Sequence, residues 1–242
     1  MLYIYCPSCH STNIKKNGRT YYGKQNHQCK CCGRQFVLNN QHTKSEWLKM
    51  LIKKSLKERI SLRGICRIFG VSMTWLQSFA HLFWEQTPTD LGLDAQMTRR
   101  IKKLQVFGIQ ADELWSFVQK KKNKRWIWVA YDPVHRLVIA YHIGSRSKLA
   151  AQKFWSKIPD ALKSCFFETD DWEAYQSIIP AQQHKIGKDL TFYIEGFNAT
   201  IRARVSRLVR KSLSFSKLDK WHNLAIGWFF WQFNLERIKH YI

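Results

Sequence analysis

Two groups of residues in this sequence have types and spacings suited to chemistry: four cysteines near the start and three widely spaced acids. Cys6-Pro-Ser-Cys9 and Cys29-Lys-Cys-Cys32 are two C-x2-C pairs, separated by nineteen residues. Tetrahedral zinc needs four soft ligands, and each pair supplies two thiolates from one tight turn. The spacing therefore predicts a Zn2+ site made of Cys6, Cys9, Cys29 and Cys32.

Two alternatives to this zinc site stay open. His27 and Cys31 could compete as ligands, although Cys31 breaks the spacing of its pair. The cysteines could instead form disulfides, but the chain opens without the basic and apolar segments of a secretory signal, which favours a reducing cytosol. About forty residues cannot bury a sufficient core, so metal binding would supply the folding energy. We therefore expect residues 1–40 to form a zinc ribbon, serving DNA contact or structure alone.

Glu195 is the only acid between Asp189 and Asp219, in a segment rich in arginine. Apolar residues recur there at the three- and four-residue steps of a helix with one buried stripe. That stripe consists of Ile194, Phe197, Ile201, Val205 and Leu208. The positions three and four residues from Glu195 carry no charge, so its own helix leaves the carboxylate unpaired. This favours a divalent metal or a distant partner, and an ordinary surface glutamate is the alternative.

Two further acids stand where predicted strands end. Asp112 follows the predicted strand Val106–Ala111, and Asp170 follows the predicted strand Ser164–Thr169. If these strands are parallel neighbours, both carboxylates emerge at one edge of the sheet, where Glu195 could join them.

Three hard oxygen ligands in a basic protein are what one or two Mg2+ (or Mn2+) ions need when phosphates complete their coordination. Two such ions about 3.5–4 Å apart would serve phosphoryl transfer. Glu113 and Asp171 are alternatives to their neighbours. Asp112 and Asp170 could instead cap a turn and a helix.

The elements that must position these acids alternate between strand and helix patterns. Beyond the two strands above, we expect strands Arg125–Tyr131 and Leu137–His142 and helices Lys148–Lys157, Trp172–Ile178 and Trp221–Ile238. This order indicates an α/β domain with a mixed sheet covered by helices.

An all-α segment precedes that domain. Thr43-Lys-Ser-Glu46 can form a capping box for a helix through Lys57. In the following helix, Leu62–Phe69, the apolar residues share one face; Gly70 then supplies a left-handed turn residue and Ser72 can cap a second helix. We therefore predict a helix-turn-helix domain, although any helical hairpin shares much of this pattern.

The second helix of that domain would reach DNA, and residues 41–95 would form the domain as a whole. The residues predicted to contact DNA there are Thr74, Trp75, Gln77 and Ser78. Residues 96–106, with Arg99 and Arg100, are expected to be a basic linker.

The charge balance points to a polyanionic partner. Forty Lys and Arg against seventeen Asp and Glu give a net charge of +23, and nucleic acid is the commonest ligand of such a field. A membrane is not expected as partner, because no apolar run approaches the ~18 residues of a spanning helix. The expected location is cytoplasmic, in a bacterial or archaeal cell and associated with the nucleoid.

Several short motifs distributed along the chain carry a resemblance to a known family. They are Cys6-Pro-Ser-Cys9, Lys16-Asn-Gly18, Gln28-Cys29, Ala111-Asp-Glu-Leu-Trp115, Thr169-Asp170 with Tyr175, Ile194-Glu195 with Asn198, and the run Arg210–Lys217. With these motifs the chain resembles the DDE transposases of the insertion-sequence-one family, in the form that fuses InsA and InsB.

The resemblance implies an RNase H-like catalytic domain over residues 107–242, with Asp112, Asp170 and Glu195 as metal-binding carboxylates. It also implies an N-terminal module that recognises terminal inverted repeats. Asp171 stands where the family usually has glycine, which keeps it as a competitor of Asp170. The chain is also continuous, whereas such proteins are often made from two reading frames.

We therefore expect a transposase that binds the ends of its element, cleaves DNA and joins it to a target. A DNA-binding regulator and a nuclease without joining activity are the alternatives. Further DNA contacts are expected from Asn198, Arg202, Arg210 and Lys211. Two DNA ends must be held together, so a homodimer or larger assembly is expected, with aromatic residues of 221–233 as a candidate interface.

Overall fold

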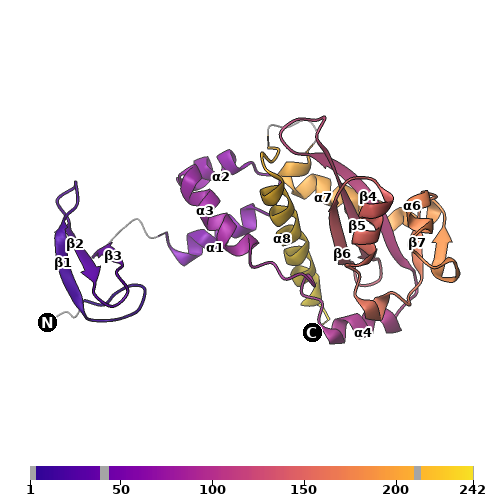
Figure 1. The fold of residues 1–242 in the computed structure, drawn as a ribbon, viewed down its shortest axis with the longest axis horizontal. Helices are drawn as coiled ribbons and strands as arrows, with labels where there is room; N and C mark the ends of the chain where they lie inside the picture. Colours follow the sequence, from indigo (N-terminus) through magenta and orange to yellow (C-terminus); the bar gives the residue numbers. More distant parts are fainter. Residues whose placement is uncertain (1–3, 39–43, 210–213, 242) are drawn as a thin grey trace. The chain divides into compact units, whose positions relative to one another are not determined.

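The computed structural model describes residues 4–38, 44–209 and 214–241 of the chain. Contacts divide the chain into two compact units, Met1–Met50 and Leu51–Ile242. Figure 1 follows the chain by colour, from the N-terminal strands to the long C-terminal helix. We call these the N-terminal unit and the C-terminal unit and describe each by itself.

The N-terminal unit contains a small antiparallel sheet of β1 (Ile14–Arg19), β2 (Gln25–Cys29) and β3 (Gln35–Val37). Strands β1 and β2 form a hairpin between the two cysteine pairs, and β3 adds a third strand after the second pair. Among residues 4–38, only Cys6, His27 and Cys29 are buried. So small a core cannot hold three strands by apolar burial alone.

Helix α1 (Glu46–Ser55) spans the boundary between the two units. The backbone N–H of Leu48 donates to Ser45 Oγ at 3.2 Å, which caps the first turn. The helix ends before Lys57, the end that we predicted. Thr43 of the predicted capping box lies outside the described residues.

Helices α2 (Leu62–Phe69) and α3 (Met73–Trp84) are joined by a three-residue turn. Gly70 has φ 60° and ψ 36°, the left-handed conformation expected of it. The backbone N–H of Trp75 donates to Ser72 Oγ at 3.2 Å, as predicted for the cap of the second helix. The local signals in the sequence therefore define this turn.

The predicted linker is largely helical. Helix α4 (Ala95–Lys103) begins where the N–H of Met97 donates to Asp94 Oδ1 at 2.7 Å, and it buries Met97, Thr98 and Ile101. Basic side chains occupy positions between these buried residues. The high charge of the segment led us to predict a linker, although one face of this helix is buried.

The C-terminal unit is built on a five-stranded sheet in the order β6-β5-β4-β7-β8. The strands are β4 (Ile109–Phe117), β5 (Lys124–Asp132), β6 (Leu137–Gly144), β7 (Phe167–Thr169) and β8 (His184–Ile186). Strands β4, β5 and β6 pair antiparallel, whereas β7 is parallel to both β4 and β8. The expected mixed sheet is present, with β8 as a strand that the sequence did not reveal.

The first strand of this sheet differs from the prediction. Strand β4 begins at Ile109 and continues through Asp112 to Phe117, so Asp112 lies in mid-strand and not at its end. Val106 and Phe107, expected in the strand, precede it and are exposed. The reason is the partner strand, because β5 pairs with β4 from Gln110 to Phe117.

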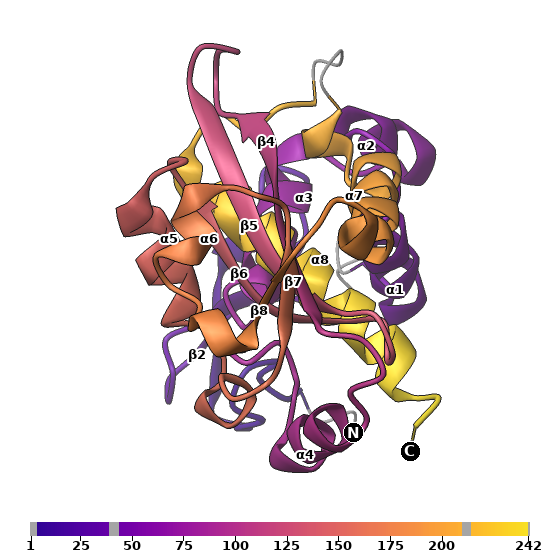
Figure 2. The same cartoon turned by 90° about the vertical axis from the view of Figure 1, so that its right-hand side faces the viewer.

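Helices cover both faces of the sheet (Figure 2). Helices α5 (Lys148–Trp155) and α6 (Glu173–Gln176) lie on one face, and α7 (Phe192–Arg204) and α8 (Asp219–Ile238) lie on the other. Short 3-10 turns connect these elements at Asp160–Leu162, Ala181–Gln183, Asp189–Thr191 and Ser206–Leu208. Each face has its own apolar cluster.

Helix α7 has the buried stripe that we predicted, since all five stripe residues are buried. The helix ends at Arg204, earlier than expected, because Val205 adopts an extended conformation with φ −91° and ψ 102°. Val205 and Leu208 remain in the core as part of the following turn.

The aromatic residues of α8 have a different role from the one expected. Trp228, Phe229, Phe230 and Phe233 are buried within the C-terminal unit, against the sheet or against α3. They therefore give no support to an oligomeric interface. Of the helices in the described residues, none is long and apolar enough to cross a membrane.

Candidate active site and metal centre

The parallel pairing of β4 and β7 brings Asp112 and Asp170 to the same level of the sheet. Ile109 pairs with Phe167 and Gln110 with Glu168. Continuing this register places Asp112 opposite Asp170, immediately beyond the last residue of β7. The expected parallel neighbours are therefore present, although Asp112 lies within its strand.

Gln110 fixes the start of α7 against β4. Its Oε1 accepts the backbone N–H of Ile194 at 2.9 Å, and its Nε2 donates to Glu168 Oε2 at 3.2 Å and to the carbonyl of Leu190. Gln110 and Glu168 are both buried. Because Glu195 follows Ile194, this bridge brings the glutamate to the aspartates.

Two hydrogen-bond donors hold the Asp112 carboxylate, but its surroundings disfavour its ionised form. Asn198 Nδ2 donates to Asp112 Oδ2 at 2.7 Å, and the backbone N–H of Glu113 donates to Asp112 Oδ1 at 2.7 Å. Burial, together with the charges of Asp170 and Glu195, nevertheless raises the pKa of Asp112 to about 6. A cation bound beside Asp112 would stabilise the ionised carboxylate and so offset the effects of burial and of the two neighbouring charges.

Two acceptor atoms beside Asp112 are also unsatisfied. Asp170 Oδ1 and Asn198 Oδ1 are buried and lack a hydrogen-bond partner. Glu195 is exposed and accepts from Thr191 Oγ1 at 3.3 Å. In the described part of the chain Glu195 makes no ion pair, as its sequence surroundings suggested. This donor set fits a hard divalent cation.

The three carboxylates approach one another without closing into a preformed chelate. Among the described residues, only the cysteine quartet brings three or more His, Cys, Asp or Glu ligand atoms within 4.8 Å of one another. The acids therefore form a more open site than the cysteines.

The two competing acids have other partners. Glu113 is buried and accepts from Arg146 Nε at 2.6 Å and from the Tyr175 hydroxyl at 2.8 Å. Asp171 is exposed and accepts from Gln176 at 2.9 Å. Because residues alternate sides along a strand, Glu113 faces away from Asp112.

The four predicted cysteines do converge. The sulfur atoms of Cys6 and Cys32 are 3.5 Å apart, as are those of Cys9 and Cys29, and all four lie within 4.8 Å of one another. Zn–S bonds of about 2.3 Å put the sulfurs of a tetrahedral site roughly 3.8 Å apart. All seven cysteines are free, so the disulfide alternative is wrong.

The four thiols do not ionise alike: burial and the neighbouring sulfurs raise the pKa of the Cys9 thiol to about 12. The backbone N–H of Cys32 is the main factor that lowers the pKa of the Cys29 thiol to about 6. The two competing ligands lie outside the cluster: Cys31 contacts Ser11 Oγ at 3.1 Å, and His27 stacks on Phe36. The cluster of four cysteines is compatible with a zinc ribbon.

The predicted DNA-contacting residues of α3 lie on its surface. Thr74, Gln77 and Ser78 are exposed, whereas Trp75 is half-buried and stacks on Phe79 with ring centroids 5.0 Å apart.

The other predicted DNA contacts are scattered. Arg99 and Arg100 are exposed on α4, where Arg100 also donates to the carbonyl of Tyr241. Arg202 lies on α7 two turns after Glu195, and Arg210 and Lys211 lie outside the described residues.

Sequence reasoning missed the polar residues that support the acids, namely Gln110, Glu168, Arg146 and Thr191. Buried polar residues in strands have no periodic signature of their own. The available signal was the interruption of otherwise apolar strand patterns by Gln110 and Glu168.

Comparison with known proteins identifies the class of this protein as a transposase. Residues 106–236, from just before β4 to near the end of α8, match the family described as IS1 transposase. The chain belongs to the IS1 transposase family.

Curated relatives agree with this assignment. The chain is 36% identical over 132 residues to the insertion element IS1 protein InsB of Shigella flexneri, covering 54% of this chain and 95% of the relative. It is 34% identical over 132 residues to the IS1 4 protein InsB of Escherichia coli K12, covering 75% of that relative. The IS1 protein InsB of Shigella sonnei is likewise 34% identical, with 95% of its length covered.

Proposed function

We propose that this protein is a DNA transposase that cleaves DNA and transfers strands with Asp112, Asp170 and Glu195 as the ligands of its catalytic metal. The observation that carries the proposal is the environment of Asp112. Its pKa is raised to about 6 by burial and by the charges of the other two acids. Cation binding relieves such repulsion between neighbouring carboxylates.

Mg2+ or Mn2+ bound there would supply charge stabilisation for the phosphate and activation of the attacking oxygen. The protein's own residues would bind the metal ion and orient its ligands. Asp112 and Asp170 offer oxygens from neighbouring parallel strands, Asn198 orients Asp112, and Gln110 anchors the helix that carries Glu195. In this proposal water first releases a 3′ hydroxyl, which then attacks target DNA in line.

The proposed catalytic domain has the RNase H-like fold that the family resemblance implies. Its support is the five-stranded mixed sheet with helices on both faces, with Asp112 in β4 and Asp170 immediately after the adjacent parallel strand β7. The domain boundaries proposed from the sequence are 1–40, 41–95 and 107–242, with residues 96–106 now assigned mainly to α4.

The N-terminal part is proposed to recognise the terminal inverted repeats of the element. Its support is the cluster of four cysteines, which would hold Zn2+, and the pair α2–α3 joined by a tight turn. Double-stranded DNA, as element ends and as target, is the proposed partner. A homodimer or larger assembly would hold two ends together.

A strand-transfer assay with oligonucleotides carrying the element's ends tests this function. We expect a joined product that requires Mg2+ or Mn2+. Hydrolysis without joining would indicate a nuclease, and binding without either reaction would indicate a regulator.

Variants assign the reaction to the proposed residues. Asp112→Asn, Asp170→Asn and Glu195→Gln should each lower the rate by about a thousandfold or more while sparing DNA binding. Asp171→Asn is the matched control, because this exposed neighbour contacts Gln176 and should retain activity. An active Asp170→Asn beside an inactive Asp171→Asn would reject the assignment of the second ligand.

A further inference from the structure

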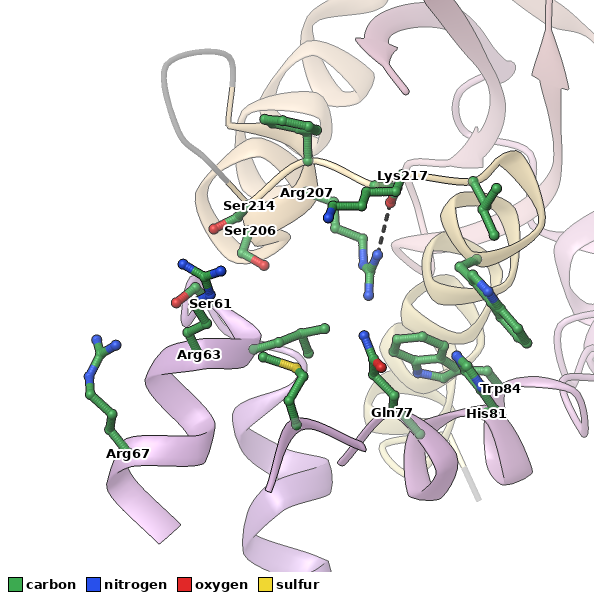
Figure 3. A pocket seen from close by; sticks show the side chains of 17 residues that line it. Ser61, Arg63, Arg67, Gln77, His81, Trp84, Ser206, Arg207, Ser214 and Lys217 are labelled. Carbon is green, nitrogen blue, oxygen red and sulfur yellow. Dashed lines mark hydrogen bonds between the residues drawn. The ribbon is translucent and has the colours of Figure 1, made fainter. Parts of the chain in front are cut away.

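A second candidate site lies in the C-terminal unit, outside the carboxylate cluster. A pocket of about 780 Å3 opens between helices α2 and α3 on one side and the segments 206–207 and 214–221 on the other (Figure 3). Ser214–Lys217, the end of the motif run singled out in the sequence, forms part of its wall.

The walls of this pocket carry charge of one sign. Its lining includes Arg63, Arg67, Arg207 and Lys217 and no Asp or Glu. In the described part of the chain none of these four cations forms an ion pair. The undescribed residues include no Asp or Glu.

Arg207 points into the pocket and is held there by neutral groups (Figure 3). Its Nη1 donates to Ser216 Oγ at 2.8 Å, and its Cζ lies 4.9 Å from the ring centroid of Trp84. Ser216 in turn contacts His222, whose pKa burial lowers to about 4, so this imidazole is neutral. Burial lowers the pKa of Arg207 to about 10, which leaves the guanidinium charged at neutral pH.

Two acids that act on the same histidines as Arg207 are already paired with other cations. Asp219 accepts from Arg125 at 2.7 Å, and Glu85 lies 2.7 Å from Lys220. The guanidinium of Arg207 is partly buried, lies among three further cations and has no carboxylate partner. It therefore lacks a counter-charge within the described protein.

The chemistry of the lining selects the ligand. Arginine presents several donors in a planar fork that matches the oxygens of a phosphate. Gln77 of α3 lies across the pocket from Arg207 and adds an amide (Figure 3). We propose that this pocket binds a backbone phosphodiester of DNA, as a phosphate site separate from the carboxylates.

The separation of the two sites follows from the strand that links them. Ser216 at the pocket pairs with Val118, six residues beyond Asp112 along the extended β4 chain. At ~3.3 Å per residue this distance is about 20 Å. A DNA strand covers it in about six nucleotides at 3.4 Å each. The pocket and the carboxylates are therefore separate sites, and the strand between them is comparable in length to a short stretch of DNA.

The inference rests on the proposed function only in taking DNA as the source of the phosphate. The test measures binding without catalysis, using the full-length zinc-loaded protein and a labelled DNA duplex without added Mg2+. Fluorescence anisotropy at several salt concentrations gives the slope of log affinity against log salt. Each lost phosphate contact should reduce the magnitude of this slope by about 1.

The variants are Arg207→Gln, Arg207→Lys and Arg63→Gln, with Arg136→Gln as matched control. Arg136 is exposed in the turn after β5, at the other end of the sheet from Ser216. Arg207→Gln should weaken binding roughly tenfold and reduce the slope by about 1, Arg63→Gln should reduce the slope similarly, and Arg207→Lys should retain the slope. A slope equal to that of the control in both Gln variants overturns the proposal.

Two further measurements separate the alternatives. Thermal unfolding reports whether Arg207→Gln folds, and the exposed Arg63→Gln keeps the test decisive if it does not. Inorganic phosphate is the small-anion probe: stabilisation that is lost in the pocket variants, together with an unchanged DNA slope, overturns DNA as the ligand.

The same binding measurement on Asp112→Asn distinguishes this inference from the proposed function. Normal binding with lost strand transfer supports the carboxylate assignment, whatever the pocket variants do. A reduced slope in the pocket variants supports the phosphate site even if Asp112→Asn retains activity.

Discussion

The cysteine cluster and the carboxylate cluster are both candidate metal centres, yet one is closed and the other open. The four sulfurs lie within 4.8 Å of one another, whereas the three acids of the described chain do not reach that proximity. The cysteines come from two short turns, and the acids come from β4, the end of β7 and α7.

The difference teaches what each site does for the fold. The N-terminal unit buries almost nothing besides two of its cysteines, so its metal would take the place of a core. The carboxylates belong to a sheet and to a helix packed on it, and the apolar cluster on each face of that sheet can hold repelling charges together without a metal. The cysteine cluster with its metal would stabilise the N-terminal unit, whereas the carboxylate cluster without a metal lowers the stability of the C-terminal unit.

The largest effect is expected in the N-terminal unit. Cys29→Ser should abolish zinc binding and unfold the β1–β3 sheet, because structural zinc contributes about 10–16 kcal/mol at pH 7. The C-terminal unit, which has its own core, should keep its unfolding temperature. Zinc content by mass spectrometry and amide NMR signals of residues 4–38 measure the change.

Cys31→Ser is the control for this variant, since the exposed Cys31 contacts Ser11 and lies outside the quartet. It should retain one zinc per chain. If Cys29→Ser binds zinc normally, or if Cys31→Ser loses it, the four cysteines are not the zinc ligands, and the contrast between a closed and an open metal site fails.

Neighbouring acids on β4 should respond in opposite directions. In protein without added divalent cation at pH 7, Asp112→Asn should raise the free energy of unfolding by about 1–3 kcal/mol, because the ionised carboxylate is disfavoured. Glu113→Ala should lower it by about 1–3 kcal/mol, because the buried Tyr175 hydroxyl loses its acceptor. Urea unfolding of the two variants measures both changes.

The pH dependence supplies the control for the first of these changes. The pKa of Asp112 is raised to about 6 in the fold, so its ionisation costs stability as pH rises from about 4 through 6. The advantage of Asp112→Asn over the natural chain should therefore shrink on acidification and vanish near pH 4. A destabilised Asp112→Asn at pH 7 would contradict the strained state of this site.

The elements predicted well from the sequence are those whose determinants are local. The turn between α2 and α3 depends on Gly70 and Ser72, and the cysteine pairs on their own spacing, so a single stretch of sequence contains the information. The buried stripe of α7 was likewise correct. Its early end was missed because the apolar period continues through Val205 and Leu208.

The features that escaped prediction depend on partners far away in the sequence. The length of β4 follows from its pairing with β5, and the short β8 exists as a strand only beside β7. The bridge from Gln110 to Glu168 and α7 joins three elements, and no local pattern marks it. The sequence thus indicated which acids to consider, and tertiary contacts determine how they meet.

The smallest effect is expected from Asn198, which orients a carboxylate without being one of the three acids. Asn198→Ala should raise the Mg2+ concentration for half-maximal strand transfer roughly tenfold, as losses of supporting contacts around a metal do. The amide of Asn198 lowers the pKa of Asp112, so its removal raises that pKa further, and the effect should be larger at pH 6 than at pH 8.

Thr200→Ala on the same helix is the control, because the Thr200 hydroxyl bonds to the Gly196 carbonyl. A lower rate at saturating Mg2+ with an unchanged metal requirement would show that Asn198 acts on DNA and not through Asp112.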